Sequence, residues 1–222
     1  MSEHSPTYNP PPDTSLDIRY IDDALLVVDK PAGLLSVPGR GSGKQDCLSA
    51  RVQARYPEAL PVHRLDLGTS GLLVLARGPA MHRALNRLFE TRRVEKRYVA
   101  LVAGRMAPGE RLIELPLIAD WPNRPRQMVD HAIGKPSRTR LRVAGYDAGL
   151  DATRVDLFPE TGRSHQLRVH LQAIGHPILG DELYAPPEVF ARASRLLLHA
   201  AFLGFIHPST AAALQVESAA SF

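Results

Sequence analysis

The sequence lacks the features that mark membrane, secreted and disulfide-linked proteins. It has a single cysteine, Cys47, which excludes an internal disulfide and any CxxC metal site. No apolar run approaches the ~18 residues that a transmembrane helix needs. The N-terminal stretch MSEHSPTYNPPPDTS has neither a basic segment nor an apolar segment, unlike a secretory signal. We therefore expect a soluble chain in a reducing, cytoplasmic setting.

The composition that remains fits a globular protein. The 222 residues suit one domain of ordinary to large size, and 44% hydrophobic residues suffice for a sizeable core. The net charge is +4. A small basic excess is compatible with a polyanionic partner such as nucleic acid, but its distribution matters more than its sum.

The chain divides into a short arm and one domain. Residues 1–16 are polar, and three consecutive prolines, Pro10 to Pro12, enter neither a helix nor a central strand. We expect a disordered or loosely attached arm there. Residues 17–222 show no internal repeat and no clear second domain. Short strands mixed with two or three helices, without regular βαβ alternation, predict an α+β fold.

Hydrophobic periodicity places the main elements. We predict helices over 46–56, with Asp46 as the cap, over 79–92 and over 164–174. We predict strands over 72–76 and 98–102 and a hairpin over 138–159. Residues 24–28 are a short apolar run before turn residues, and 195–201 are a further apolar segment that continues to 206.

The stretch HRLDLGTSG places Asp66 in a connection just before a strand that reads as buried. Gly68 and Gly71 permit tight backbone geometry there. An exposed loop on a rigid scaffold is a common setting for functional side chains, and Arg64 shares the same local surface. The alternative is structural: Asp66 caps a turn and Arg64 is a solvated charge.

The stretch GRSHQLRVH gathers two arginines, two histidines and a glutamine at the start of a predicted helix. Its histidines are five residues apart, which does not place both on one helix face, so a helical metal pair is disfavoured. The helix N-terminus and Arg163 together suit an anion, either a carboxylate from another loop or a phosphate. An ordinary polar helix start is the structural alternative.

Three further groups have both a structural and an RNA-binding interpretation. Tyr98, on an apolar strand beside two basic residues, is either a core tyrosine or a ring that stacks on a base. A row of arginines at period two forms either a solvated sheet face or a track for an RNA backbone. A tryptophan with arginines in a proline-broken loop either anchors that loop or contacts RNA. The row is Arg138, Arg140 and Arg142, and the loop carries Trp121, Arg124 and Arg126.

Four motifs in this order and spacing resemble the RluA family of RNA pseudouridine synthases. They are HRLDLGTSG, EKRYVALV, GRSHQLRVHLQAIGHPILGDELY and RLLLHAAFL, and DKPAGLLSVPG upstream is similar to that family's opening hairpin. The resemblance covers roughly residues 18–208. It implies an α+β fold with a mixed, mostly antiparallel sheet, flanked by helices and loops around a catalytic cleft. DWPNRPRQMVD is similar to the RluA branch, which lacks the small S4-like RNA-binding domain of several relatives. The tail LQVESAASF departs from the family, where we expect a proline, and leaves the last strand's course open.

The resemblance implies a reaction and a role for each motif residue. The enzyme detaches uracil from ribose, rotates the base and rejoins it through C5, with no cofactor and no metal. Asp66 matches the catalytic aspartate, and Arg163 matches the arginine that pairs with it and keeps it charged. Arg64 matches the arginine that enters the RNA stack where the target base has left. Tyr98 matches the tyrosine that stacks on the uracil, and Leu197 or Leu198 gives the pocket an apolar wall.

The resemblance also suggests the substrates and leaves two rival functions. Similarity to the RluA branch implies a uridine in the anticodon stem-loop of tRNA, one in a 23S ribosomal RNA hairpin, or both. We expect a monomer with no obligate protein partner and no membrane. A non-catalytic RNA-binding protein on the same fold needs the basic surface but not Asp66. An N-glycosidase-type hydrolase is disfavoured, because glycoside hydrolysis usually takes two cooperating carboxylates and the stretch HRLDLGTSG supplies only one, Asp66.

Overall fold

The structure, a computed structural model, describes residues 8–222, and these form two compact units. Unit 1 contains the described residues up to Arg93 together with Phe205–Ser218, and unit 2 contains Val94–Gly204 with Ala219–Phe222. Every strand pair described within a unit is antiparallel. These sheets, with few helices, confirm the predicted α+β class. The predicted boundary of one domain over 17–222 stays a prediction.

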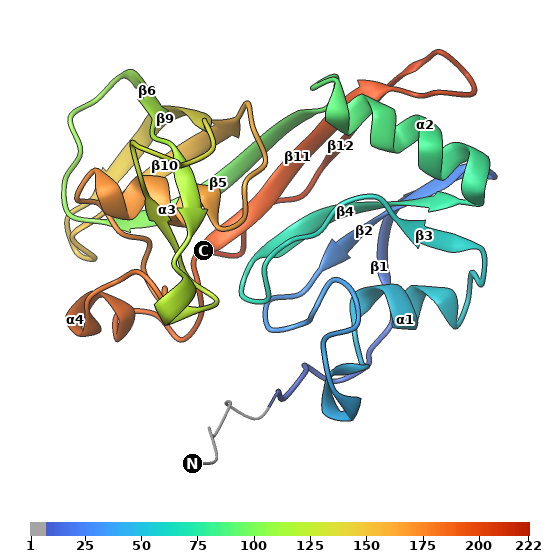
Figure 1. The fold of residues 1–222 in the computed structure, drawn as a ribbon, viewed down its shortest axis with the longest axis horizontal. Coiled ribbons are helices and arrows are strands. Elements are labelled where there is room, and N and C mark those ends of the chain that lie inside the picture. Colours follow the sequence, from blue (N-terminus) through green and yellow to red (C-terminus); the bar gives the residue numbers. More distant parts are fainter. Residues whose placement is uncertain (1–7) are drawn as a thin grey trace. The chain divides into compact units, whose positions relative to one another are not determined.

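Unit 1 is a small sheet with two helices (Figure 1). Its strands are β1 (Asp17–Ile21), β2 (Leu25–Lys30), β3 (Ala59–Pro61), β4 (Ser70–Arg77) and β12 (Ala213–Glu217). Its two α-helices are α1 (Leu48–Gln53) and α2 (Pro79–Glu90), and a short 3-10 turn, η1 (Ser42–Lys44), precedes α1. β2 pairs with both β1 and β4. The first four residues of β2 and the middle of β4 are apolar, both strands are buried on both faces, and α2 packs on β4. This rigid pair carries the HRLDLGTSG loop at the start of β4.

Unit 2 is a five-stranded sheet covered on one face by α3 (Gln166–Ala173). The strand order is β11 (Leu198–Ile206), β5 (Glu95–Ala103), β10 (Ala152–Pro159), β9 (Arg138–Asp147) and β6 (Glu110–Glu114). A separate hairpin of β7 (Leu117–Ala119) and β8 (Gln127–Val129) encloses η2 (Trp121–Asn123), and α4 (Pro187–Phe190) is one short turn. Leu167 and Leu171 of α3 pack on Leu141, Leu157 and Leu198 of the sheet.

The predicted strands and the hairpin are confirmed, and two helix starts are wrong. The first helix begins at Leu48 rather than at residue 46. Cys47 is its N-cap, because Cys47 is extended and its Sγ accepts the N–H of Ala50 at 3.5 Å. Asp46 instead binds Arg51. The helix predicted over 164–174 begins only at Gln166, since His165 adopts a left-handed conformation with φ of 53°.

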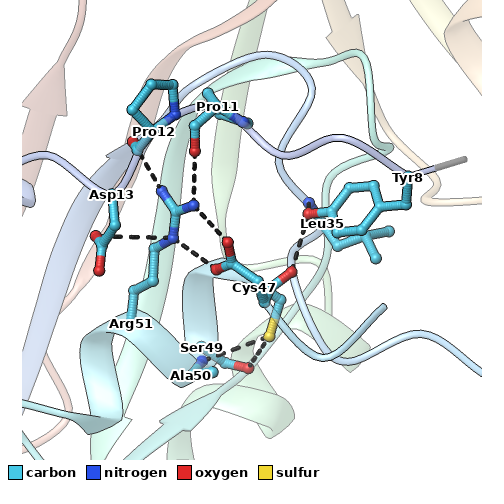
Figure 2. A network of polar contacts seen from close by, with 10 residues as sticks. Tyr8, Pro11, Pro12, Asp13, Leu35, Cys47, Ser49, Ala50 and Arg51 are labelled. Atoms are coloured by element: carbon cyan, nitrogen blue, oxygen red, sulfur yellow. Dashed lines mark hydrogen bonds and ion pairs between the residues drawn. The ribbon is translucent and has the colours of Figure 1, made fainter. Parts of the chain in front are cut away.

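The described part of the predicted arm belongs to unit 1 and contacts the rest of that unit around Arg51, as Figure 2 shows. Residues 1–7 lie outside the described residues, and 8–16 form no helix or strand. The Arg51 guanidinium donates to the carbonyls of Pro11 (2.7 Å) and Pro12 (3.2 Å) and to the Asp46 carboxylate (2.7 Å). The Tyr8 hydroxyl donates to the Asp46 carbonyl and accepts from the N–H of Leu35. The hydrogen bond with Arg51 lowers the pKa of Asp46.

Candidate active site

Asp66 lies in unit 1, in a loop between β3 and β4 that is fixed on both sides. The carbonyl of Asp66 accepts the N–H of Thr69 at 3.1 Å and closes a tight turn. One residue earlier, the Ser36 hydroxyl donates to the Leu65 carbonyl (2.7 Å) and accepts the Leu65 N–H (3.0 Å). One residue later, the Leu67 carbonyl accepts the N–H of Gly33 at 2.9 Å. The backbone on both sides of Asp66 is therefore held by contacts to the stretch that contains Gly33 and Ser36.

Lys30 places a buried positive charge next to this loop, and the sequence interpretation missed it. The side chain is fully buried at the end of β2. Its Nζ donates to the carbonyls of Leu34 (2.7 Å), Pro31 (3.0 Å) and Leu67 (3.3 Å). Burial lowers the pKa of Lys30 to about 7, while the charges of Asp66 and Asp29 oppose the shift. The signal available in the sequence was a lysine directly after the apolar run LLVVD.

Arg163 lies in unit 2, in the loop between β10 and α3, and Gln166 fixes its backbone. The Gln166 side chain is 4% exposed and makes four hydrogen bonds. Its Oε1 accepts from the Thr161 hydroxyl (2.7 Å) and from the N–H of Arg163 (3.0 Å). Its Nε2 donates to the Arg138 carbonyl and to the Thr139 hydroxyl, both at 2.9 Å. The Arg163 guanidinium is exposed, and its Nε donates to the Pro136 carbonyl at 3.3 Å.

A buried chain of hydrogen bonds continues from Gln166 into the core of unit 2. Thr139 Oγ1 lies 3.0 Å from His170 Nδ1, and His170 Nε2 lies 2.8 Å from the Ser137 hydroxyl, which donates to the Leu115 carbonyl. Every group is satisfied if His170 is neutral and carries its proton on Nε2. Burial lowers the pKa of His170, which agrees with the neutral form. The second histidine of GRSHQLRVH is therefore structural.

Tyr98 lies on the α3 face of the unit 2 sheet, together with the predicted pocket residue Leu198. On β5 Tyr98 pairs with Leu157 and Ala200, and its neighbour on the same face, Ala100, pairs with Leu198. Leu198 is buried in the core. Leu197 precedes it, is only partly buried, and packs against the same cluster as Tyr98. The structure thus brings together in unit 2 the aromatic ring and the apolar side chains that the sequence associated with it.

The arginine row of β9 points to the opposite face of that sheet. Thr139 and Leu141 are buried on the Tyr98 face, whereas Arg138, Arg140 and Arg142 are exposed. The row is not free of acids, because neighbouring strands supply them. Its ion pairs are Arg138 with Glu114 at 2.9 Å and with Glu160 at 3.5 Å, and Arg142 with Asp156 at 2.7 Å. Arg140 has no ion pair within the described residues and lies over the Phe158 ring, 4.6 Å from its centroid.

The loop between β7 and β8 presents a second set of arginines with aromatic rings. Trp121 is 65% exposed, and the Arg124 guanidinium lies 3.1 Å from its ring centroid. Arg126 lies over the ring of Tyr184, 5.5 Å from its centroid. The Tyr184 hydroxyl contacts His165, which precedes α3, at 2.7 Å. This loop therefore lies beside the N-terminus of α3 within unit 2, and an exposed Trp121 argues against a simple anchoring role.

Neither a metal site nor a membrane helix emerges from the described residues. Within 8–222, no three His, Cys, Asp or Glu side chains gather as a metal ion requires. The same residues contain no helix long and apolar enough to cross a membrane.

Arg64, the other charged residue of the HRLDLGTSG stretch, also lies in unit 1. Its side chain is exposed, two residues before Asp66 in the sequence.

Known proteins similar to this chain share one activity. The family described as RNA pseudouridylate synthase matches residues 24–173. The dual-specificity RNA pseudouridine synthase RluA of Escherichia coli (strain K12) is 52% identical over 215 residues, covering 97% of this chain and 98% of that protein. RluA of Vibrio vulnificus (strain CMCP6) is 50% identical over 91% of this chain and 82% of that protein. Among solved structures, human RNA pseudouridylate synthase domain containing 1 matches with a TM-score of 0.79 at 30% identity, covering 95% of this chain and 86% of that one.

Proposed function

Because the chain belongs to the RluA family of RNA pseudouridine synthases, we propose that it isomerises defined uridines in both tRNA and large-subunit ribosomal RNA. The observation that carries the substrate proposal is the likeness to the dual-specificity relatives over nearly their whole length. The tRNA target is a uridine of the anticodon stem-loop, and the ribosomal target a uridine of a 23S hairpin. The enzyme acts as a monomer in the cytoplasm and needs no protein partner.

The reaction exchanges one bond for another within a single nucleotide. The bond from ribose C1′ to uracil N1 breaks, the base rotates, and a bond from C1′ to C5 forms. The hydrogen on C5 leaves and N1 gains one, so no oxidant, reductant or other group is consumed. Asp66 is the catalytic carboxylate, acting as nucleophile or base. The fixed backbone of its loop supports this role, because a reacting group needs a defined position.

The other motif residues serve Asp66 and the base. Arg163 supplies the cation that keeps the Asp66 carboxylate ionised, and Gln166 fixes the Arg163 backbone for that purpose. Tyr98 stacks on the extruded uracil, and Leu197 and Leu198 provide an apolar wall. Arg64 occupies the vacancy in the RNA stack, a role that suits an exposed guanidinium beside the catalytic loop.

The RNA surface of the proposal combines two arginine groups of unit 2. Arg124 and Arg126 lie with aromatic rings on an exposed loop, a combination suited to stacking and to phosphates. Arg138, Arg140 and Arg142 contribute from the other sheet face. Within that row Arg140 has the largest share, since the other two guanidinium groups are already paired with acids.

The test compares Asp66→Asn with wild type on a tRNA transcript and on a ribosomal hairpin. We expect the variant to bind both RNAs with unchanged affinity and to lose turnover about a thousandfold or more, because the substitution removes the reacting carboxylate. Asp147→Asn, at an exposed hairpin turn, is the matched control and keeps full activity. Near-wild-type turnover by Asp66→Asn contradicts the catalytic assignment. Release of free uracil by wild type would identify a hydrolase, and binding without pseudouridine would identify a binding protein.

A further inference from the structure

Lys96 is a partly buried cation without a partner in the described chain. It lies on β5, and within residues 8–222 its side chain has no hydrogen bond and no ion pair. Its neighbour Arg97 differs, since the Arg97 guanidinium lies 3.5 Å from the Asp156 carboxylate. Desolvation by burial lowers the pKa of Lys96, and no acidic group opposes that shift. Lys30, the other buried lysine, has three carbonyl acceptors.

The position of Lys96 relates it to Tyr98. Side chains alternate along a strand, so Lys96 and Tyr98 project from the same sheet face, separated by about 6.6 Å along β5. Glu95 and Arg97 project from the other face. On the neighbouring strand, Lys96 pairs with Leu203 and Tyr98 with Ala200, so the partners offer no charge. The Lys96 ammonium still reaches solvent, since within the described residues the buried side-chain nitrogen that lacks a hydrogen-bond partner belongs to His207.

A cation in this setting is suited to a ligand anion. Partial burial without an opposite charge disfavours the charged ammonium, and an anion that reaches Nζ from solvent offsets that cost. The substrate of the proposed function is a polyanion with one phosphate on each side of every nucleotide. If Tyr98 stacks on the target base, the phosphates that flank that base lie one sugar away from it. A lysine two residues from Tyr98 on the same sheet face is placed to meet one of them.

We propose that Lys96 binds a backbone phosphate that flanks the target uridine. This inference rests on the proposed function and adds a contact to it: Tyr98 holds the base, and Lys96 holds the backbone from which the base has turned. An ammonium has three donors and no directional fork, which suits a phosphate whose oxygens rotate as the base is extruded. The contact selects RNA that presents an extruded nucleotide, so it contributes to substrate binding more than to the chemical step.

The test uses Lys96→Gln in the full chain, with Lys44→Gln as the matched control. Lys44 is a partly buried lysine of unit 1, so both variants lose the same charge. We expect Lys96→Gln to raise KM about tenfold, with kcat changed less than threefold, since a charged hydrogen bond is lost. The slope of log Kd against log salt should fall by about 0.7, as for one contact to single-stranded phosphate. Lys96→Arg should recover most of the affinity, and circular dichroism of each variant verifies folding.

A second measurement identifies the phosphate. Methylphosphonate linkages, which are neutral, replace in turn the two phosphates that flank the target uridine. One of them should weaken wild-type binding about tenfold and leave Lys96→Gln unchanged. If wild type and Lys96→Gln lose RNA affinity equally at each methylphosphonate position, the proposal is wrong. The proposal is also wrong if Lys96→Gln and Lys44→Gln have the same KM and the same salt dependence, and Lys96 then only extends its nitrogen to solvent. Wild type that forms no pseudouridine on the unmodified RNA contradicts the proposed function instead.

Discussion

Gln166→Leu tests whether the position of Arg163 depends on one buried amide. The substitution keeps the side chain's approximate volume and removes four hydrogen bonds. Two of the former partners keep another bond: the Arg138 carbonyl still accepts the N–H of Glu160, and the Thr139 hydroxyl still contacts His170. The Thr161 hydroxyl hydrogen and the Arg163 N–H lose their acceptor.

The magnitude follows from those two orphaned donors. Each unsatisfied buried donor costs about 1–3 kcal/mol, and the Arg163 N–H is near enough to solvent to recover part of that. We therefore expect the free energy of unfolding to fall by about 2–4 kcal/mol, measured by urea denaturation. Where the variant is still folded, kcat should fall about a hundredfold with little change in KM, because a reacting site tolerates little displacement.

Gln172→Leu is the matched control, since it makes the same substitution at an exposed position of the same helix. It should change the free energy of unfolding by less than about 0.5 kcal/mol and leave kcat unchanged. Equal stability of the two variants would refute the argument from orphaned donors. A destabilised Gln166→Leu with wild-type kcat would show that Arg163 is positioned by other contacts, such as the one to Pro136.

Three further predictions concern single charges. Burial lowers the pKa of Lys30 from 10.5 to about 7, so between these pH values the unfolded chain binds more protons than the folded one. The free energy of unfolding should therefore rise with pH over that range. Urea denaturation from pH 7 to 9.5 should show this rise, and Lys30→Met should abolish it. Burial lowers the pKa of His170 below 6.5, so stability should fall as pH drops below 6.5, and His170→Gln should flatten the denaturation curve between pH 6.5 and 5. Arg140→Glu should weaken RNA binding severalfold and reduce its salt dependence, whereas unchanged binding across a salt titration would show that the row serves only the sheet.

The apolar pattern of the sequence predicts the elements that bury hydrocarbon. β4 is apolar along its length, and Met81 and Leu85 of α2 recur at helical spacing, so both elements were predicted correctly. The hairpin of β9 and β10 follows from alternation at period two. The short strands β6, β7 and β8 were not predicted, because three to five residues with at most one buried position carry no clear periodicity.

The candidate site was predictable where chemistry follows from residue type, and less so where it follows from long-range contact. Asp66 and Arg163 stand in recognisable motifs. The sequence suggests that Lys30 belongs to a turn. Only the contact of its side chain with the Leu67 carbonyl, 37 residues later, shows that a buried lysine lies beside the Asp66 loop. The acids that pair with the arginine row come from β6 and β10, which periodicity within one strand cannot reveal. The two helix starts failed for local reasons, because Cys47 rather than Asp46 caps α1 and His165 adopts a left-handed backbone before α3.

The most direct test of the account is site-resolved pseudouridine mapping of a tRNA transcript and a ribosomal RNA hairpin, each incubated with the purified wild-type protein alone. The account predicts pseudouridine at one defined uridine in each RNA, without added metal or cofactor, and none with Asp66→Asn. Unmodified RNA despite tight binding, or equal modification by Asp66→Asn, would contradict it.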